Sequence, residues 1–386
     1  MLNRIRRIGA VLAVLGLASF GGTAGAQDFS TTAEFAALMD FESGTMLYQK
    51  NADERLEPAS MAKLMTIAVV FDEIRRGRLT MDDEFFISEH AWRTGGAASG
   101  GSTMFAELNS RVRVEDLLRS VIIQSGNDAS IALAEGIAGT EETFALVMNQ
   151  TAQRIGLENS HFTNAAGLPD PDMYSTARDL ADLGRYLIRE YPEHYHMFSE
   201  QEFTWNNIRQ QNRNSLVEMG IGVDGLKTGH TNAAGYGIVA STTAGGRRLI
   251  AVVHGLDSMR ERAEEGRKLI TWGTRGFELL PIYPEGAVVG HADVYGGAEP
   301  SVPLVGNGKI DLFIPRGAQN CPQASIVYRG PLRPPVAEGT QVAELHVMCN
   351  GVLVQQTPLF AGRDVGEGDL MRKATDALKH LAIGWL

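Results

Sequence analysis

The sequence predicts an α+β fold, in which helices cover an antiparallel sheet, followed by a smaller all-β domain. Strand-like runs occur near residue 35 and again at 236–255, with helical periodicity between them, which is the order expected of one sheet covered by helices. Short apolar runs broken by Gly and Pro follow at 283–362. At 386 residues the chain also exceeds the size at which a single core stops growing, so two domains are expected.

The composition is that of a soluble globular protein, with 44 % hydrophobic and 21 % charged residues. The formal net charge is -11, and no run of Lys and Arg dominates any segment. Because binding to nucleic acid needs a basic face, the charge argues against nucleic acid as a partner.

Residues 1–26 have the composition of a secretory signal. A basic start, an apolar stretch at 8–20 and a small-residue site at 24–26 follow one another. The basic residues are Arg4, Arg6 and Arg7. The apolar stretch of about 13 residues is shorter than the roughly 20 that cross a bilayer, which argues against a membrane-spanning anchor. We therefore expect an exported protein that begins at Gln27.

The first expected elements are a hairpin and a long buried helix. Apolar-rich runs at 35–40 and 45–49 flank a turn at Gly44, which indicates two paired strands. Apolar residues then recur at steps of three and four from Pro58 to Arg76. This spacing predicts a helix with a broad buried face.

Helices dominate the middle of the sequence. Periodic apolar patterns occur at 114–124, 129–137, 141–155 and 177–191. We expect Ser175 to cap the last of these helices, with Asp179 three places beyond Thr176 as in a capping box.

Strands return in the second half of the chain. β-rich runs at 236–243 and 248–255 are joined by a short glycine turn, which predicts a hairpin, and a helix is expected at 262–280. These elements complete a first domain of 27–282. The broken apolar runs that follow assign 283–362 to a second, all-β domain.

The last segment, 369–386, has the apolar stripe of an amphipathic helix. The stripe consists of Leu370, Ala374, Leu378, Leu381 and Trp385. This segment is too short and too charged to span a bilayer. Two alternatives remain: the stripe packs on the β domain, or it lies in a membrane interface where basic residues meet anionic lipid.

The chain has two cysteines, Cys321 and Cys349. Because export would bring both into an oxidising compartment, we expect one disulfide between them. The closed loop of about 28 residues would contribute about 3–4 kcal/mol of stability in the chain-entropy model. Two unpaired buried thiols are the alternative.

Three short motifs occur in order along the chain: Ser60-Met61-Ala62-Lys63, Ser125-Gly126-Asn127 and Lys227-Thr228-Gly229. A serine and a lysine three apart at the start of a helix lie on one face, so the amine can act as the base of the hydroxyl. The second motif lies between two expected helices, from which side chains can project into a cleft. The third precedes a strand and offers a cation, a hydroxyl and a position without a side chain, which substrate backbone can approach closely.

The ordered set resembles the signature of penicillin-binding proteins and serine β-lactamases. A chain of this length contains about one Ser-x-x-Lys and about 0.05 of each tripeptide by chance, which gives about 0.003 for the set. The residues around the motifs are similar to those of low-molecular-mass D-alanyl-D-alanine carboxypeptidases. They are Glu57-Pro58-Ala59-Ser60, Gln124-Ser125-Gly126-Asn127-Asp128-Ala129, Asp224-Gly225-Leu226-Lys227-Thr228-Gly229-His230-Thr231 and Thr271-Trp272-Gly273. The resemblance covers essentially the whole chain, more weakly after Pro281, and implies a DD-peptidase/β-lactamase-like fold.

The resemblance implies acyl transfer on peptidoglycan stem peptides. Ser60 would attack the carbonyl between two D-alanines, and water would hydrolyse the acyl-enzyme. Lys63 would be the acylation base, held neutral by burial and by the positive charge of Lys227. Ser125 would relay a proton to the leaving amine, and Asn127 would orient the substrate amide.

The resemblance also assigns the remaining binding residues. The substrate-binding set would be Asn127, Lys227, Thr228, Gly229, His230 and Arg262. Of these, Lys227, Thr228 and Arg262 would face the terminal carboxylate, and the backbone N–H groups of Ser60 and His230 would form the oxyanion hole. β-Lactam antibiotics would acylate the same serine, no metal or organic cofactor is required, and the expected location is the periplasmic face of the cytoplasmic membrane.

Other constellations in the sequence are weaker. No Gly-x-Ser-x-Gly elbow occurs. His194 and His196 lack a third metal ligand nearby, so a solvated loop is expected there. The glycine-rich segment 95–101 lacks a Walker lysine, so we expect a flexible loop at the border of the cleft.

Among related activities, a carboxypeptidase is favoured over a β-lactamase because the chain continues into a second domain and a terminal helix. A DD-endopeptidase acting on cross-links would share all three motifs. A non-catalytic wall-binding scaffold would not need to keep Ser60, Lys63 and Lys227 together.

Overall fold

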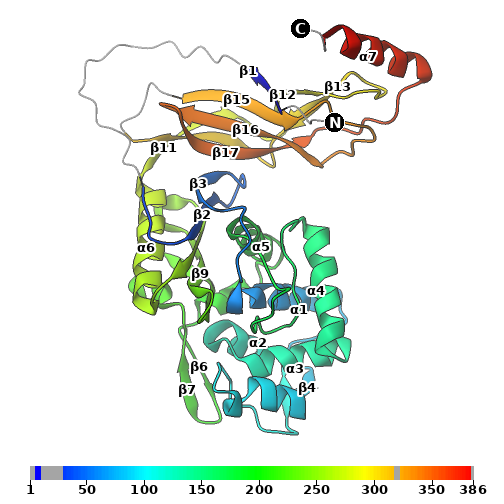
Figure 1. Ribbon diagram of the computed structural model, residues 1–386. Coiled ribbons are helices and arrows are strands. Elements are labelled where there is room, and N and C mark those ends of the chain that lie inside the picture. The colour runs from blue at the N-terminus through cyan, green and yellow to red at the C-terminus, as the bar shows by residue number, and fades with distance from the viewer. Residues whose placement is uncertain (1–4, 10–28, 317–321, 384–386) are drawn as a thin grey trace. The chain divides into compact units, whose positions relative to one another are not determined.

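The computed structural model describes residues 5–9, 29–316 and 322–383, and the chain divides into two compact units (Figure 1). The larger unit consists of Phe29–Met39 and Gln49–Thr274. The smaller unit consists of Asp40–Tyr48 and Arg275–Leu386, together with the N-terminal residues. Each unit has a buried apolar core of its own.

An antiparallel sheet lies at the centre of the larger unit. Its strands follow the order β2 (Phe35–Asp40), β10 (Leu249–Leu256), β9 (Gly235–Thr242) and β8 (Val223–Thr231). β9 pairs antiparallel with both of its neighbours. β9 and β10 are almost entirely buried, as expected of apolar strands that are covered on both faces. The predicted α+β class is confirmed, and so is the hairpin at 236–255.

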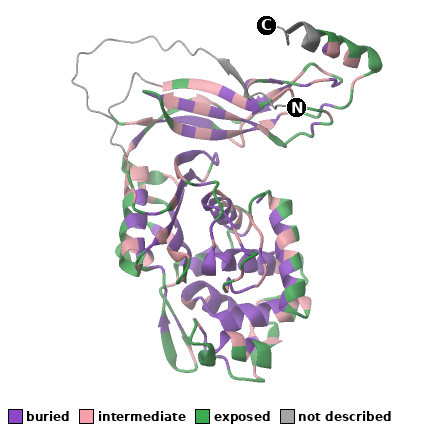
Figure 2. Cartoon of the chain, in the orientation of Figure 1, coloured by how far each residue is buried: buried purple, intermediate pink, exposed green. Residues whose placement is uncertain are grey.

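Helices make up most of the rest of the larger unit. The longer ones are α1 (Lys63–Arg75), α2 (Val114–Arg119), α3 (Asn127–Ala138), α4 (Glu141–Ile155), α5 (Ala177–Glu190) and α6 (Met259–Arg275). The short ones are η1 (Ala59–Ala62), η2 (Ala91–Gly95), η3 (Ala97–Ser99), η4 (Ser120–Gln124), η5 (Tyr195–Ser199), η6 (Ser215–Met219) and η7 (Ala244–Gly246). α1 is enclosed for most of its length, because every residue from Lys63 to Asp72 is buried. Figure 2 accordingly draws most of this helix in purple.

Two small sheets complete the larger unit. β4 (Glu84–Phe86) pairs with β5 (Arg111–Arg113), and β6 (Glu202–Trp205) pairs with β7 (Ile208–Gln211). The β6–β7 hairpin precedes the segment that carries Arg213, which contributes to the site described below.

The helix expected over 262–280 is wrong at its C-terminal end. α6 stops at Arg275, and β11 (Phe277–Tyr283) follows in its place. β11 pairs antiparallel with β14 (Ile310–Pro315). Its residues gain the hydrogen bonds of a sheet there, and this tertiary pairing overrides the local helical pattern.

The expected N-cap of α5 is also wrong by one residue. The side chain of Thr176 caps the helix by accepting the N–H of Asp179 at 3.0 Å. Ser175 is occupied elsewhere, because its hydroxyl contacts that of Ser160 at 2.8 Å.

The smaller unit is dominated by antiparallel strands. Besides β11 and β14, its strands are β1 (Ile5–Gly9), β3 (Met46–Lys50), β12 (Val288–Asp293), β13 (Ser301–Val305), β15 (Pro322–Arg329), β16 (Gln341–Cys349) and β17 (Val352–Ala361). β16 pairs with β15 and β17, and β1 pairs with β15. Burial alternates along β16, so one of its faces packs into the core and the other is more open to solvent.

The terminal helix α7 (Leu370–Ile383) packs through its polar side. The carboxylate of Asp376 accepts the backbone N–H of Gly296 at 2.9 Å, and Asp376 is 9 % exposed. By contrast, Leu370 is 87 % and Leu378 is 68 % exposed. The described part of the apolar stripe therefore does not pack on the strands, while Leu381 and Trp385 lie outside the residues whose side chains are described.

Two further expectations concern residues that are wholly or partly outside the described ranges. Residues 1–4 and 10–26 of the expected signal lie outside them, and so does Cys321. Cys349 is disulfide-bonded, but its pairing with Cys321 stays a prediction. Among the helices that are described, none is both long and apolar enough to cross a membrane.

Candidate active site

The turn η1 and the start of α1 bring Ser60 and Lys63 together. The Nζ of Lys63 donates a hydrogen bond to the Oγ of Ser60 at 2.9 Å. Lys63 is fully buried, whereas Ser60 is partly exposed. The spacing of three residues thus places an amine beside the hydroxyl, and only the hydroxyl is open to solvent.

Ser125 and Asn127 lie at the break between η4 and α3. Ser125 adopts the left-handed conformation (φ 67°, ψ 35°), which ends one helix and redirects the chain before the next begins. The Oδ1 of Asn127 accepts a second hydrogen bond from Lys63 Nζ at 2.8 Å. The Oγ of Ser125 is buried and has no hydrogen-bond partner in the part of the chain that is described.

The carboxylate of Asp128 fixes this break in place, and the sequence did not single it out. It accepts hydrogen bonds from Thr103 Oγ1 at 2.6 Å, from the N–H of Met104 at 2.9 Å and from the N–H of Ala106 at 3.2 Å. Asp128 is fully buried. It therefore ties the segment 103–106 to the start of α3.

The third motif lies inside β8 rather than before a strand, which corrects the expectation. Lys227 is 1 % exposed, and its Nζ donates to the backbone carbonyl of Thr228 at 3.1 Å. A Cβ placed on Gly229 would lie 3.0 Å from the carbonyl oxygen of Pro58 and 3.2 Å from the N of Met61. The missing side chain therefore lets the segment that carries Ser60 approach β8 closely.

A cleft of about 870 Å³ opens at these elements. Its lining includes seven of the nine residues in the predicted catalytic and binding sets: Ser60, Ser125, Asn127, Thr228, Gly229, His230 and Arg262. Lys63 and Lys227 are buried and do not line it. Gly100 and Gly101 of the glycine-rich segment line the cleft as well.

Four cations surround the cleft, and within the described residues none of them forms an ion pair with a carboxylate. Burial and the positive charge of Arg213 lower the pKa of Lys63 to about 7. Burial, together with Lys63, Arg213 and Arg262, lowers the pKa of Lys227 well below its ordinary value. Burial and Arg213 lower the pKa of Arg262 to about 10. Arg213 therefore adds to the repulsion that was expected between Lys63 and Lys227, which is expressed in the lowered pKa of Lys227.

Arg213 is the main functional candidate that the sequence did not reveal. Its backbone N–H donates to the carbonyl of Ile123 at 3.0 Å, and its carbonyl accepts from Arg262 Nη2 at 3.1 Å. It lines the cleft, and burial lowers its pKa. A single arginine between expected elements has no periodicity or motif that would have indicated this position.

The loop that carries Ala165 and Ala166, which contacts Lys63, was also not predicted from the sequence. The carbonyl of Ala166 accepts a hydrogen bond from Lys63 Nζ. The preceding residue, Ala165, is held through its carbonyl by Thr66 Oγ1 at 2.7 Å and through its N–H by Glu141 at 2.9 Å. The amine of Lys63 is thus surrounded by fixed neutral oxygen acceptors.

His194 and His196 take no part in this site. His194 packs against the ring of Phe71 at 4.9 Å between centroids, and the Nδ1 of His196 contacts the carbonyl of Glu193 at 3.0 Å. Among the described residues, no group of three or more His, Cys, Asp and Glu side chains is arranged to hold a metal ion.

The chain is similar to two protein families along most of its length. A family model described as D-alanyl-D-alanine carboxypeptidase matches residues 22–258. A second model, described as penicillin-binding protein 5, C-terminal domain, matches residues 277–367.

Individual relatives agree with this match. D-alanyl-D-alanine carboxypeptidase DacC of Escherichia coli (strain K12) is 42 % identical over 343 residues, which cover 88 % of this chain and 86 % of that protein. The crystal structure of penicillin binding protein 5 from Haemophilus influenzae has a TM-score of 0.70 and 40 % sequence identity, and covers 89 % of this chain and 100 % of that chain. Penicillin-binding protein D2 from Listeria monocytogenes, in an ampicillin-bound form, has a TM-score of 0.56 and 28 % identity, and covers 64 % of this chain and 99 % of that chain.

Proposed function

Because this chain belongs to the D-alanyl-D-alanine carboxypeptidase family, we propose that it removes the terminal D-alanine of peptidoglycan stem pentapeptides through an acyl-enzyme on Ser60. It is a serine-type hydrolase of that family. The observation that carries the residue assignment is the Lys63 amine, which lies 2.9 Å from Ser60 Oγ and has a pKa lowered to about 7. A neutral amine at that distance can accept the proton of the hydroxyl.

In the acylation step, Ser60 Oγ attacks the carbonyl carbon between the two D-alanines while its proton passes to Lys63 Nζ. The carbon–nitrogen bond then breaks, and the leaving amine of D-alanine takes up a proton. Ser125 supports this transfer, because its buried hydroxyl lines the cleft and has no other partner among the described residues. Water then hydrolyses the ester, which frees Ser60 and the shortened peptide.

The cations without carboxylate partners form the site proposed for the substrate's terminal carboxylate. Thr228, Arg262 and Arg213 line the cleft, and Lys227 lies buried on the same strand as Thr228. A bound carboxylate would supply the negative charge that these groups lack in the free protein. Asn127 is proposed to orient the substrate amide.

The oxyanion hole is proposed to consist of the backbone N–H groups of Ser60 and His230. Both residues line the cleft, and Gly229 lets β8 approach the segment that carries Ser60. Such donors stabilise the negative charge that develops on the carbonyl oxygen.

The remaining expectations concern the organisation and location of the chain. We propose a signal at 1–26, a catalytic domain at 27–282, a β domain at 283–362 and a terminal helix at 369–386. The helix is proposed to contact the periplasmic face of the cytoplasmic membrane, because Leu370 and Leu378 are exposed while Asp376 is buried and bound to the turn at Gly296.

The decisive experiment uses a fluorescent penicillin on the exported protein. Wild type should be labelled covalently, mass spectrometry should locate the adduct on Ser60, and Ser60→Ala should not be labelled. Labelling that survives Ser60→Ala would reassign the nucleophile. Products formed from a pentapeptide and from a cross-linked dimer separate carboxypeptidase from endopeptidase activity, and slow release of the penicilloyl group separates both from a β-lactamase.

A further inference from the structure

Glu57 bridges two elements that meet at the cleft. It lies three residues before Ser60, and its Oε1 accepts a hydrogen bond from Thr231 Oγ1 at 2.8 Å. Thr231 is the last residue of β8, next to His230, and its Oγ1 also accepts the N–H of Ala234 at 3.0 Å. One carboxylate therefore joins the segment before the nucleophile to the end of the β8 strand.

The main chain of Glu57 is held from the sheet as well. Its backbone carbonyl accepts a hydrogen bond from the imidazole of His254 on β10. His254 is 1 % exposed, and burial lowers its pKa to about 4, so the ring is neutral at neutral pH. Its Nδ1 has no partner in the described part of the chain, which assigns the donated proton to Nε2. The imidazole of His254 packs against Gly237 of β9, where a side chain would not fit. A Cβ on Gly237 would lie 2.2 Å from Nδ1 of His254.

The segment that Glu57 holds is conformationally strained. Ala59, immediately before the nucleophile, has a φ of +48°, in the left-handed region that alanine avoids. A residue stays in such a conformation only when the surrounding contacts hold it there. Upstream, the N–H of Leu56 donates to the carbonyl of Ser175 at 2.8 Å. The direction of the Ser60 backbone N–H therefore depends on a strained turn that Glu57 anchors.

We propose that Glu57 is a positioning residue that sets the separation of the backbone N–H groups of Ser60 and His230, with Thr231 and His254 as its two partners. This inference rests on the proposed function, in which those two N–H groups form the oxyanion hole. Glu57 does not line the cleft, so it acts on the donors and not on the substrate. Its loss weakens binding of the transition state while leaving ground-state binding intact.

The test uses full-length protein carrying Glu57→Ala, Glu57→Gln, Thr231→Val and the double variant Glu57→Ala/Thr231→Val. Glu57→Ala and Thr231→Val should each lower kcat for a D-Ala-D-Ala peptide, and the rate of acylation by penicillin, about 100-fold with little change in KM. The double variant should be no slower than either single one, because both changes remove the same hydrogen bond. Glu57→Gln keeps an acceptor oxygen and should restore most of the rate.

The variant His254→Phe keeps a ring in the same space and removes the donor to Glu57. It should lower kcat about 10-fold, the size expected for one hydrogen bond. Thr32→Val is the matched control, since Thr32 Oγ1 donates to Glu261 Oε1 at 2.6 Å in an exposed pair of the same kind. Its kcat should equal that of wild type.

Thermal unfolding of each variant separates positioning from loss of the fold. If Glu57→Ala does not fold, Glu57→Gln and Thr231→Val still test the proposal. Only Thr231→Val loses the hydrogen bond between residues 57 and 231, so only its kcat should fall. The positioning role would be overturned if Glu57→Ala and Thr231→Val were acylated at the wild-type rate, or if their KM rose while kcat stayed constant. In either case, penicillin labelling of Ser60 would still support the proposed function. A penicillin adduct on a residue other than Ser60 would instead overturn the proposed function itself.

Discussion

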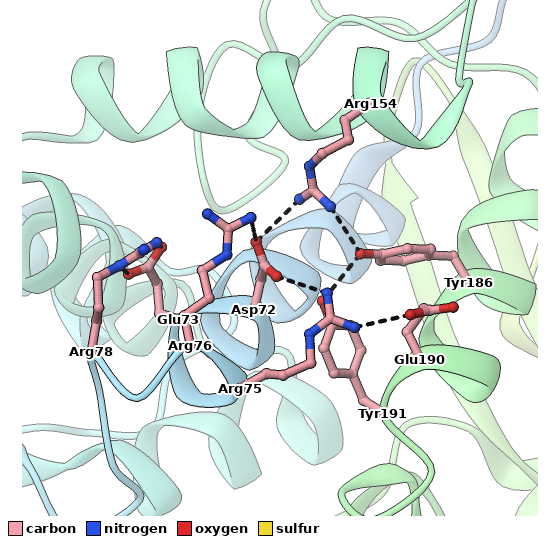
Figure 3. A network of polar contacts seen from close by, with 9 residues as sticks. All are labelled: Asp72, Glu73, Arg75, Arg76, Arg78, Arg154, Tyr186, Glu190 and Tyr191. Atoms are coloured by element: carbon pink, nitrogen blue, oxygen red, sulfur yellow. Dashed lines mark hydrogen bonds and ion pairs between the residues drawn. The ribbon is translucent and has the colours of Figure 1, made fainter.

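The two ends of α1 differ in whether their basic side chains have carboxylate partners. At its N-terminal end, Lys63 is buried and makes its hydrogen bonds to Ser60, Asn127 and Ala166, none of them through a carboxylate. At its C-terminal end, Arg75 and Arg76 gather around the carboxylate of Asp72 (Figure 3). The same helix thus carries one cation without a counter-ion and, about three turns away, a cluster of paired ones.

The paired end has the geometry of a structural network. Asp72 accepts Arg75 at 2.9 Å, Arg76 at 2.8 Å and Arg154 at 3.1 Å, and Arg75 also reaches Glu190 at 2.9 Å. Burial alone would lower the pKa of Arg75, but its hydrogen bonds to Asp72 and Glu190 outweigh burial and raise it. The network joins α1, α4 and α5 in the larger unit, as Figure 3 shows.

The difference shows how one helix separates stability from chemistry. A carboxylate beside a cation keeps that cation charged and makes it an anchor. Where neutral oxygens replace the carboxylate and burial is complete, the charged form loses its advantage, and the amine becomes a base near neutral pH. Burial of the Lys63 amine is therefore expected to lower the stability of the fold and to make the amine a base. Asp72 is expected to contribute to stability alone.

The largest expected effect comes from removing the amine of Lys63, which has no carboxylate partner. Lys63→Met should lower the rate of Ser60 acylation about 1,000-fold or more, because the hydroxyl loses its base. The same variant should unfold at a temperature close to that of wild type, because removal of a buried amine is offset by the loss of its hydrogen bonds to Asn127 and Ala166. Penicillin labelling and thermal unfolding measure the two quantities. Arg76→Met at the other end of α1 is the matched control and should acylate at the wild-type rate.

The next effect concerns binding of the substrate carboxylate. Lys227→Ala should lower kcat/KM about 100-fold, because the terminal carboxylate loses the buried amine beside Thr228 on β8. Peptides that lack this carboxylate should show a much smaller difference between the variant and wild type. Equal losses with both kinds of peptide would show that Lys227 does not recognise the carboxylate.

The paired end should respond in the opposite sense. Asp72→Asn should lower the free energy of unfolding by about 2 kcal/mol, less than for a fully buried pair because its arginines are 39–45 % exposed. Urea denaturation measures this change, and kcat should stay at the wild-type value. Arg78→Ala, which removes a more exposed pair with Glu73, should leave the denaturation midpoint unchanged. A fall in kcat without a fall in stability for Asp72→Asn would contradict the hypothesis that the C-terminal end of α1 affects stability and not catalysis.

Sequence reasoning found the reactive end and missed the paired one, for a physical reason. Ser60 and Lys63 are three residues apart on one helix, so local geometry alone brings them into contact. Arg154 meets Asp72 from α4, 82 residues away, and only the packing of two helices creates that contact. Arg213 was missed for the same reason, because its effect on Lys63 arises from the tertiary fold and not from local spacing.

The same rule accounts for the rest of the fold. The helix at 141–155 and the hairpin at 236–255 were predictable because periodicity and turn residues are local signals. The end of α6 was not, because β11 owes its strand conformation to pairing with β14. Likewise the close approach at Gly229 depends on where β8 meets the turn before Ser60.

The smallest expected effect is on the pH dependence of acylation. With the pKa of Lys63 at about 7, the rate should fall about tenfold for each pH unit below 7 and level off above it, because only the neutral amine accepts the proton. Arg213→Gln should move this inflection to higher pH, because the positive charge of Arg213 is a cause of the lowered pKa. Penicillin labelling rates between pH 5 and 9 give the inflection directly.

Arg154→Gln at the paired end provides the control for this shift. It removes a cation of the same type from the same unit, but one whose hydrogen bonds go to Asp72 and Tyr186 and not toward Lys63. Its inflection should coincide with that of wild type. If Arg154→Gln and Arg213→Gln moved the inflection equally, the pKa of Lys63 would follow the overall charge of the unit. The difference between Lys63 and the arginines at the other end of α1 would then not depend on whether a carboxylate lies beside them.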